Sequence, residues 1–311
     1  MKIVFFGTPE FAIPSLDRLI ADGHEVAAVV TMPDKIAGRG HKLIQSDVKK
    51  YALEHDIPVL QPEKLRDPEF LDRLRALGAE LFVVIAFRML PEVVWAMPPR
   101  GTFNLHAALL PKFRGAAPIN RAIMAGETET GVTTFFLNHE IDMGSIIDQR
   151  SIPILPEDNV GTVYDKLMAL GADMVSETVS SLEAGTVTPR PQPEGEFIPA
   201  PKIFKEDCQI HWSDPAEKIH NQVRGLSPYP AAFSSLTDIQ DRHMDVKIFR
   251  TALTGIPVED TAPGSVRVGR DSLSVACGDS WIEILELQPA GKKRMDIRAF
   301  LLGYHPLTFH E

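Results

Sequence analysis

An amide and an imidazole stand two positions apart in this chain, at Asn104 and His106, directly after the apolar residue Phe103. On a β-strand, side chains two positions apart project from the same face. The Pro- and Gly-rich stretch that follows is typical of a loop leaving a strand end, and Asp142 lies in a second tight loop. Such residues are suited to binding a developing oxyanion and moving a proton. By spacing alone, however, an Asn-x-His pair is more often a turn or a satisfied polar edge than a catalytic pair.

The elements that would position these residues alternate between strand and helix. This alternation predicts an α/β fold, with an N-terminal Rossmann-like, mostly parallel open sheet and helices on both faces. Ligands of such sheets bind beyond the carboxyl ends of the strands, so Asn104 and His106 would emerge at the ligand-binding edge. The predicted strands are Lys2–Phe6, Glu25–Thr31, Pro58–Leu60, Leu81–Ala86 and Thr102–His106, and the predicted helices are Pro9–Asp22, Ser46–His55 and Asp67–Leu77.

The second half of the chain changes in composition. A Pro-rich stretch favours an extended linker, and the short strands with Gly and Pro turns beyond it predict a small β-barrel. We therefore expect a catalytic domain over residues 1–188, a linker over 189–202 and a C-terminal barrel domain over 203–311. The later predicted elements are helices at Pro118–Ala125, Val160–Leu182 and Pro215–Arg224, and strands at Gly131–Leu137, Ser145–Gln149, Val246–Arg250, Gly264–Val268, Ser272–Ala276 and Trp281–Gln288.

Composition argues against several functional classes. The 311 residues are 44% hydrophobic and 24% charged, and they contain no apolar run of the ~18 residues that suggests a membrane span, so no membrane partner is expected. Two cysteines, Cys208 and Cys277, are too few for a zinc ribbon or a disulfide framework, which favours a reducing cytoplasm. No metal-ligand motif is present, so we expect no metal. The turn Gly7-Thr8-Pro9 lacks the glycine pattern of an NAD site.

The charge distribution leaves the question of a nucleic-acid partner open. A formal net charge of −10 disfavours indiscriminate nucleic-acid binding, which normally requires a basic face. Local basic patches nevertheless lie at Lys35–Lys42, Lys112–Arg121 and Lys292–Arg294. Clusters of this size are usually solvated surface, so none of them indicates an RNA partner on its own.

Three stretches of the chain resemble the formyltransferases that use 10-formyltetrahydrofolate. They are Asn-Leu-His at 104–106, Leu-Leu-Pro-Lys-Phe-Arg-Gly-Ala-Ala-Pro-Ile at 109–119, and Ile-Asp-Met-Gly at 141–144. In that family an Asn, a His and an Asp at these positions form the active centre, so the resemblance implies that Asn104, His106 and Asp142 are catalytic. It also implies 10-formyltetrahydrofolate as the formyl donor.

The resemblance further implies two segments that line the folate pocket. One of them departs from the family pattern, because the chain reads Ala-Phe-Arg-Met-Leu-Pro at 86–91 where members often carry Ala-Tyr-Gly-Leu-Ile-Leu-Pro. Arg88, in this shortened loop, is expected either to face the glutamate tail of the folate or to be solvated. The implied folate contacts are Phe87, Arg88, Met89, Leu90, Ala108, Leu109, Leu110, Pro111 and Lys112.

Two more stretches resemble the methionyl-tRNA formyltransferase branch of the family. Met-Pro-Asp-Lys-Ile-Ala-Gly-Arg-Gly-His-Lys at 32–42 resembles the basic loop that engages the acceptor arm of initiator tRNA, with Arg39 between the glycines. Glu-Leu-Gln-Pro-Ala-Gly-Lys-Lys-Arg-Met at 286–295 resembles the end of the same enzymes, whose second domain is an OB-like barrel. The candidate tRNA contacts are therefore Lys35, Arg39, Lys42, Lys292, Lys293 and Arg294.

Together these features predict a monomeric, cytoplasmic enzyme that transfers a formyl group from 10-formyltetrahydrofolate to the α-amine of methionyl initiator tRNA. Asn104 would donate to the formyl oxygen, His106 would be a second donor, and Asp142 would orient or charge His106 and help to remove a proton. The alternatives are a sugar-nucleotide N-formyltransferase, which shares the three residues, and a non-catalytic RNA-binding protein. The basic loop and tail argue against the first, and the intact trio argues against the second.

Overall fold

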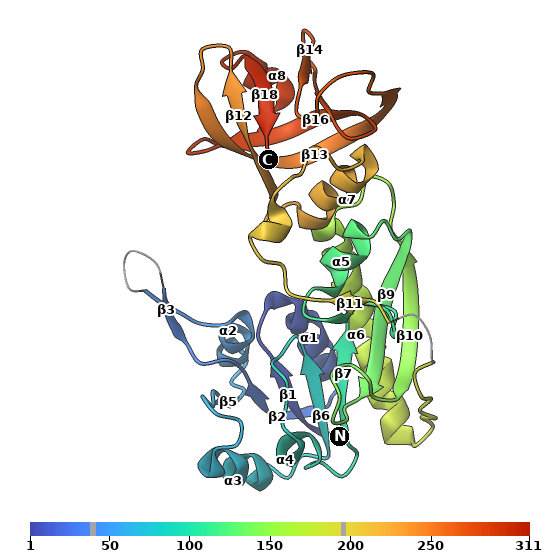
Figure 1. Cartoon of the computed structure of the whole chain (residues 1–311). Helices are drawn as coiled ribbons and strands as arrows, with labels where there is room; N and C mark the ends of the chain where they lie inside the picture. The colour runs from blue at the N-terminus through green and yellow to red at the C-terminus, as the bar shows by residue number, and fades with distance from the viewer. Residues whose placement is uncertain (38–41, 194–196) are drawn as a thin grey trace. The chain divides into compact units, whose positions relative to one another are not determined.

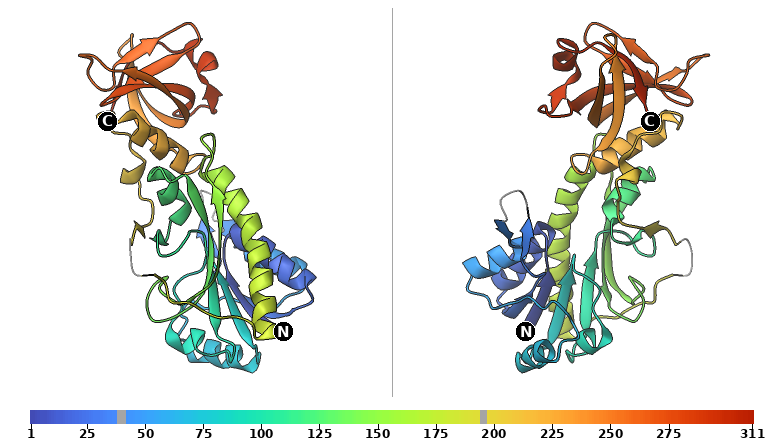
Figure 2. Two further views of the ribbon diagram at one scale, coloured as in Figure 1. Left: turned by 90° about the vertical axis from the view of Figure 1, so that its right-hand side faces the viewer. Right: turned by 60° about the vertical axis from the view of Figure 1, so that its left-hand side comes forward.

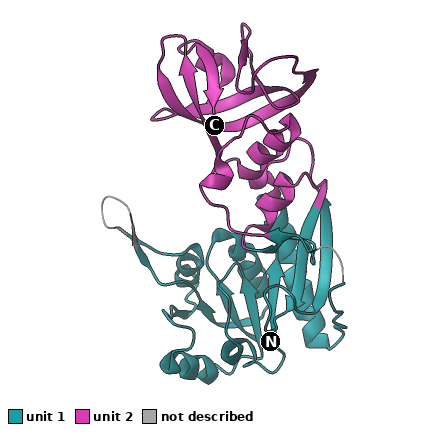
Figure 3. Ribbon diagram, viewed as in Figure 1, with its two compact units in different colours: residues 1–115, 130–152, 164–199 teal, residues 116–129, 153–163, 200–311 magenta. Residues whose placement is uncertain are grey.

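The computed structural model describes residues 1–37, 42–193 and 197–311 (Figure 1). The chain forms two compact units that are discontinuous in sequence (Figure 3). The first comprises Met1–Gly115, Thr130–Ile152 and Tyr164–Pro199, and the second comprises Ala116–Glu129, Pro153–Val163 and Ala200–Glu311. Two short segments that precede the predicted linker therefore group with the C-terminal part of the chain, whereas the predicted domains are continuous. The division at 189–202 stays a prediction.

The first unit is built on a seven-stranded sheet in the order β10-β9-β7-β6-β1-β2-β5. The strands from β7 to β5 pair in parallel, and β9 pairs antiparallel to β7. This arrangement confirms the predicted mostly parallel, Rossmann-like sheet. The strands are β1 (Lys2–Gly7), β2 (Glu25–Val30), β5 (Val59–Leu60), β6 (Leu81–Ile85), β7 (Thr102–His106), β9 (Glu129–Phe136) and β10 (Ile146–Pro153).

Helices cover both faces of this sheet, because its central strands are buried apolar runs that need a partner on each side. Val84 and Phe6 share a core cluster with Phe70 and Leu74 of α3. On the other face α6 lies along the sheet (Figure 2), and a Cβ at Gly171 would come within 2.7 Å of the Leu105 side chain. The helices are α1 (Ile13–Ala21), α2 (Asp47–Glu54), α3 (Pro68–Ala76), α4 (Glu92–Trp95) and α6 (Val160–Ala184).

Local sequence signals explain several boundaries. Ser46 caps α2 as predicted, since its hydroxyl accepts a hydrogen bond from the backbone N–H of Lys49 at 3.1 Å. The single helix predicted over Pro9–Asp22 is wrong: a 3-10 turn at Glu10–Ala12 precedes α1. Pro14 in the first turn of α1 explains the break, because proline lacks an N–H and favours a helix start.

The second unit contains the predicted small β-barrel. Its strands follow the order β14-β15-β16-β13-β12-β18, and β17 pairs with β16. A bridge between Ser265 and Thr308 brings the two ends of this order together, so the sheet is nearly closed. The strands are β12 (Ala232–Asp238), β13 (His243–Pro257), β14 (Val266–Val268), β15 (Leu273–Ala276), β16 (Ser280–Pro289), β17 (Met295–Asp296) and β18 (Pro306–His310).

Three helices belong to the second unit: α5 (Pro118–Met124), α7 (Ala216–Leu226) and α8 (Ile297–Leu301). The chain packs α5 and α7 closely, since a Cβ at Gly225 of α7 would lie 2.5 Å from the Met124 side chain. The remaining short elements are a 3-10 turn at Glu206–Cys208 and the strands β3 (Lys35–Ala37), β4 (Lys42–Ile44), β8 (Arg114–Gly115) and β11 (Pro199–Ala200). Within the described residues, no helix is both long and apolar enough to cross a membrane.

A half-buried histidine links α7 to the barrel. The Nδ1 atom of His220 is 2.9 Å from the hydroxyl of Thr251 in β13. Burial, with a smaller contribution from the positive charge of Arg224, lowers the pKa of His220 from 6.5 to about 4. Between pH 6.5 and about pH 4, His220 is therefore protonated in the unfolded chain and neutral in the folded chain. Stability that is fully present above pH 6.5 is lost as the pH falls toward 4.

We predict that acid destabilises the wild-type chain more than a His220→Gln variant, whose amide can still pair with Thr251 but does not titrate. The difference should reach about 1 kcal/mol at pH 5, after allowance for solvent screening of a partly exposed ring. Urea unfolding of both proteins at pH 7 and pH 5 measures it. An equal loss of stability in the two proteins would contradict this role of His220.

Candidate active site

The parallel pairing of β6 with β7 places the predicted catalytic pair at the carboxyl edge of the sheet. Asn104 pairs with Val84 and Leu105 with Ile85, so both strands end at the same edge. Asn104 is partly exposed, and His106 is only 6% exposed. The Asn104 amide makes no hydrogen bond to another residue in the described parts of the chain. It is therefore free to bind a substrate oxygen.

A backbone carbonyl fixes the tautomer of His106. Its Nε2 atom lies 2.8 Å from the carbonyl oxygen of Phe113, which can only accept a hydrogen bond. Nε2 must therefore carry the proton, and Nδ1 of the neutral ring is left with a lone pair. His106 can accept a proton through Nδ1, and this atom becomes a donor only once the ring is charged. His106 can therefore act as the predicted second hydrogen-bond donor to an oxyanion only when its ring is protonated.

Asp142 faces this ring from the loop between β9 and β10. Its Oδ2 atom is 3.8 Å from Nδ1 of His106 and accepts a 2.9 Å hydrogen bond from the backbone N–H of Gly115. Asp142 has a φ of 53°, a left-handed conformation that aspartate tolerates better than most residues. The structure therefore brings Asp142 beside His106, as predicted, at a distance suited to stabilising a positive charge on the ring.

The turn around Asp142 depends on a glycine. A Cβ at Gly144 would overlap the carbonyl oxygen of Phe136 in β9, so only glycine allows this close approach of two backbone segments. A backbone hydrogen bond joins the same two segments, since the N–H of Phe136 donates to the carbonyl oxygen of Ser145 at 3.0 Å. The Ile-Asp-Met-Gly sequence is thus explained by the shape of the turn as well as by the carboxylate.

Polar side chains from β9 and β10 hold the first predicted folate segment. The hydroxyl of Thr133 donates to the carbonyl of Ala108 at 2.7 Å and accepts from the N–H of Leu110 at 3.2 Å. The amide of Gln149 donates to the carbonyl of Leu110 at 2.8 Å. Ala108 and Leu110 are buried, whereas Leu109, Pro111 and Lys112 are partly exposed.

The second predicted folate segment follows β6. Leu90 is buried in the core, Phe87 packs edge-on against Phe6, and Met89 is 65% exposed. The guanidinium of Arg88 donates to the backbone carbonyls of Pro62 and Glu63, and burial lowers its pKa. Arg88 is therefore a structural tie to the chain after β5. The folate contacts themselves stay predictions.

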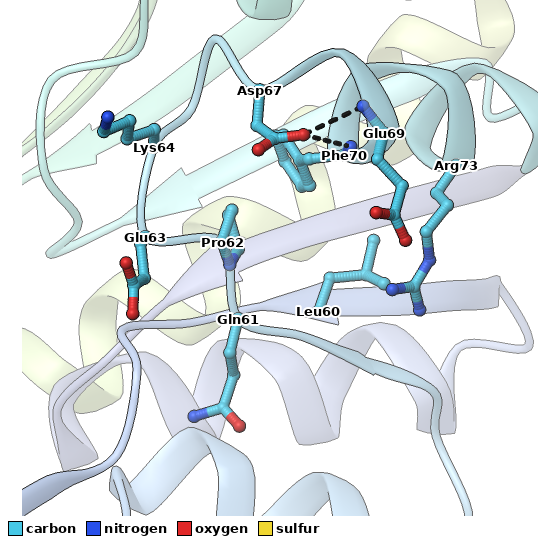
Figure 4. Close-up of a pocket in the computed structure, with 9 residues that line it drawn as sticks. All are labelled: Leu60, Gln61, Pro62, Glu63, Lys64, Asp67, Glu69, Phe70 and Arg73. Atoms are coloured by element: carbon cyan, nitrogen blue, oxygen red, sulfur yellow. Dashed lines mark hydrogen bonds between the residues drawn. The ribbon is translucent and has the colours of Figure 1, made fainter.

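A cavity of about 410 Å³ lies beyond β5, beside the N-terminus of α3 (Figure 4). Asp67 occupies that helix terminus and accepts hydrogen bonds from the backbone N–H groups of Glu69 and Phe70. None of the predicted catalytic or folate residues lines this cavity, so it is distinct from the edge occupied by Asn104 and His106. The lining residues are Leu60, Gln61, Pro62, Glu63, Lys64, Asp67, Glu69, Phe70 and Arg73.

The predicted tRNA contacts come from both units. Arg39 lies outside the described residues, Lys35 is exposed in β3, and Lys42 begins β4. Lys292 and Lys293 are exposed in the turn between β16 and β17.

Arg294 differs from its two lysine neighbours. It pairs with both carboxylate oxygens of Glu286 and stacks 4.3 Å from the ring centre of Phe249. Arg294 is thus already held by the barrel, while the lysines are the exposed charges of the patch. Whether any of these residues contacts tRNA stays a prediction.

Models of known protein families match both the N-terminal and the C-terminal part of the chain. The formyl transferase model matches residues 1–179, and the model of the formyl transferase C-terminal domain matches residues 202–305. A methionyl-tRNA formyltransferase from Bacteroides fragilis is 53% identical over 311 aligned positions, covering 98% of this chain and 95% of the relative. The chain belongs to the methionyl-tRNA formyltransferase family. A member from Porphyromonas gingivalis is 46% identical, covering 98% of this chain and 96% of the relative.

Solved structures support the fold of both units. The sugar 3N-formyltransferase WlaRD aligns with a TM-score of 0.66 at 20% identity, covering 94% of this chain and 99% of that chain. Glycinamide ribonucleotide transformylase 1 from Symbiobacterium toebii covers only 60% of this chain, with a TM-score of 0.51 at 20% identity. This match covers a smaller part of the chain than the WlaRD match does.

Sequence reasoning missed the side chains that support the family site. They are Thr133, Gln149, Arg114 and Gln192, which hold the loops around His106 and Asp142. Thr133 and Gln149 gave no signal in the sequence, because both strands carry several other polar residues and the partners of these two side chains lie far away along the chain. Across the described ranges, no group of three or more His, Cys, Asp or Glu residues is arranged to hold a metal ion.

We predict that Gly144→Ala lowers the free energy of unfolding by about 1–3 kcal/mol, because the added Cβ forces two backbone segments apart. Formyl transfer should fall as well, since the same turn carries Asp142. Gly303→Ala is the matched control, because no heavy atom lies within 4 Å of the added Cβ there. Urea unfolding and steady-state rates on both variants test this. Equal stability of the two variants would mean that the turn relaxes freely.

Proposed function

We propose that this formyltransferase takes the formyl group from 10-formyltetrahydrofolate and transfers it to the α-amine of methionine esterified to initiator tRNA. The observation that carries the proposal is the unpaired Asn104 amide beside the His106–Asp142 pair, at the carboxyl edge where sheets of this kind bind ligands. Relatives near 50% identity across nearly the full length support methionyl-tRNA as the acceptor. A cytoplasmic location and a monomeric state stay predictions.

In this mechanism Asn104 stabilises negative charge. As the amine attacks the formyl carbon, electrons move onto the formyl oxygen, and the Asn104 amide donates a hydrogen bond to it. Because the amide has no competing partner in the described chain, it is available without rearrangement. A donor of this kind contributes about 2.7–4 kcal/mol to transition-state stabilisation.

His106 and Asp142 move the proton. The free Nδ1 lone pair of His106 accepts a proton from the attacking amine, directly or through water, and Asp142 at 3.8 Å stabilises the resulting imidazolium. The charged ring then returns the proton to the departing folate nitrogen. Neither cysteine serves as a nucleophile here, because burial raises the pKa of Cys208 and raises that of Cys277 to about 12.

Acceptor selectivity tests the proposed function. Formyl transfer from 10-formyltetrahydrofolate is measured with methionyl initiator tRNA, with methionyl elongator tRNA and with an amino-sugar nucleotide. Selective formylation of the initiator is the expected result. Exclusive reaction of the sugar nucleotide would retain the catalytic trio but overturn the acceptor. Folate binding without transfer to any acceptor would leave the trio without a reaction.

We predict that Asn104→Ala and His106→Ala each reduce kcat by about two to three decades. Both side chains lie at the end of β7, outside the apolar core clusters of the sheet, so circular dichroism should show an intact fold. Single-turnover formylation of methionyl initiator tRNA measures the chemical step. Rates near the wild-type value would remove these residues from the reaction.

We predict that replacing Lys292 and Lys293 together by Ser weakens tRNA binding and reduces its salt dependence, with the slope falling by about one to two units. The two ammonium groups are exposed in the described structure. An Arg294→Ser variant is the comparison, because Arg294 is paired with Glu286 and should alter the slope less. An unchanged slope in the double variant would exclude this turn from the tRNA interface.

A further inference from the structure

The side chain of Gln192, in the segment predicted to be a linker, reaches the turn that carries Asp142. Its Nε2 atom donates to the carbonyl oxygens of Asp142 at 2.7 Å and Gly144 at 3.0 Å. Its Oε1 atom accepts hydrogen bonds from Nε and Nη2 of Arg114. Both donors and both lone pairs of this amide are thus used, which fixes its orientation.

Arg114 is the residue between the two backbone groups that hold the catalytic pair. The carbonyl before it, on Phe113, accepts a hydrogen bond from Nε2 of His106, and the N–H after it, on Gly115, donates to the Asp142 carboxylate. Through Arg114, Gln192 therefore contacts the loop after His106. Through two carbonyls, it contacts the turn of Asp142.

The backbone keeps Gln192 in register with this turn. Arg190 and Ile146 exchange two backbone hydrogen bonds, at 2.8 and 2.9 Å, so the chain two residues before Gln192 is paired to the start of β10. Asp142 and Ile146 lie two residues on either side of Gly144, whose backbone packs so closely on β9 that an added Cβ would overlap the carbonyl oxygen of Phe136. The turn is consequently held between β9 on one side and the segment of Gln192 on the other.

We propose that Gln192 is a positioning residue for formyl transfer, which sets the distance between Asp142 and His106 by joining their two loops. The inference rests on the proposed function of those residues. Gln192 touches neither reacting atom and acts through backbone groups alone. Losing its two donors frees a turn that contains a left-handed aspartate, so Asp142 can move away from His106. Displacements near 1 Å in such centres cost about 100-fold in rate.

Two variants separate the contacts of Gln192. Gln192→Met keeps the length of the side chain and removes every hydrogen bond. Gln192→Glu keeps the acceptor for Arg114 and loses both donors, and it places a negatively charged carboxylate against the carbonyls of Asp142 and Gly144. Gln222→Met is the matched control, because the Gln222 amide also donates to two backbone carbonyls, on Asp207 and Gln209, within the second unit.

Steady-state kinetics with methionyl initiator tRNA and 10-formyltetrahydrofolate, together with thermal unfolding, test the inference. We expect kcat to fall about 10- to 100-fold in both Gln192 variants, with the KM of each substrate nearly unchanged. The Gln222 control should keep the wild-type kcat despite a comparable loss of thermal stability. If Gln192 had a purely structural role, its variants and the Gln222 control would lose thermal stability to a similar extent and both would keep the wild-type kcat.

The outcomes distinguish this inference from the proposed function. If the wild type formylates initiator tRNA and both Gln192 variants keep its kcat, the positioning role is wrong and the proposed function stands. If Gln192→Glu alone keeps the wild-type kcat, the donors to the turn are not what matters, and the inference is again wrong. If the wild type formylates no acceptor, the proposed function fails first. Should Gln192→Met not fold, Gln192→Glu decides the question.

Discussion

The hydrogen bond from Nε2 of His106 to the carbonyl of Phe113 is the constraint on which the rest of the site depends. It commits one imidazole nitrogen to the protein and leaves the other, Nδ1, as the proton acceptor facing Asp142. The carbonyl can hold this position because Phe113 is 4% exposed and adopts a left-handed φ of 58°. Phe113, in the loop after β7, thus determines which ring nitrogen of His106 is available to the substrate.

The parallel sheet and its loops contribute different parts of the site. The register between β6 and β7 determines where along the edge of the sheet Asn104 and His106 lie. Leu105, between them, packs closely against Gly171 of α6 on the other face of the sheet. The carboxylate comes from a separate loop, and it is held near the ring by the N–H of Gly115 and by the side chain of Gln192, which bonds to the backbone of its turn. A strand of the central sheet therefore carries Asn104 and His106, whereas the position of Asp142 depends on hydrogen bonds between loops.

The sequence predicted the strand that carries Asn104 and His106 because apolar runs and alternating helices are local signals. The trio itself was found through family resemblance, since an Asn-x-His spacing alone favoured a turn. Contacts between distant segments were not predictable: Gln192 looked like part of a Pro-rich linker, and its bonds to residues 142 and 144 follow only from the folded chain. Likewise Arg88 read equally as a folate contact or a solvated charge, whereas it binds two carbonyls after β5. The strands β12 and β18 were missed because their alternation is short and interrupted by polar residues.

The state of the His106 ring tests the account most directly. Nitrogen-15 NMR of the histidine-labelled protein, assigned by comparison with a His106→Gln variant, reports which ring nitrogen carries the proton in the neutral form. The account predicts protonation at Nε2 and a lone pair at Nδ1, because the Phe113 carbonyl can only accept. A neutral ring protonated at Nδ1 would mean that the Phe113 bond is absent. His106 could not then take the proton of the amine through the nitrogen that faces Asp142.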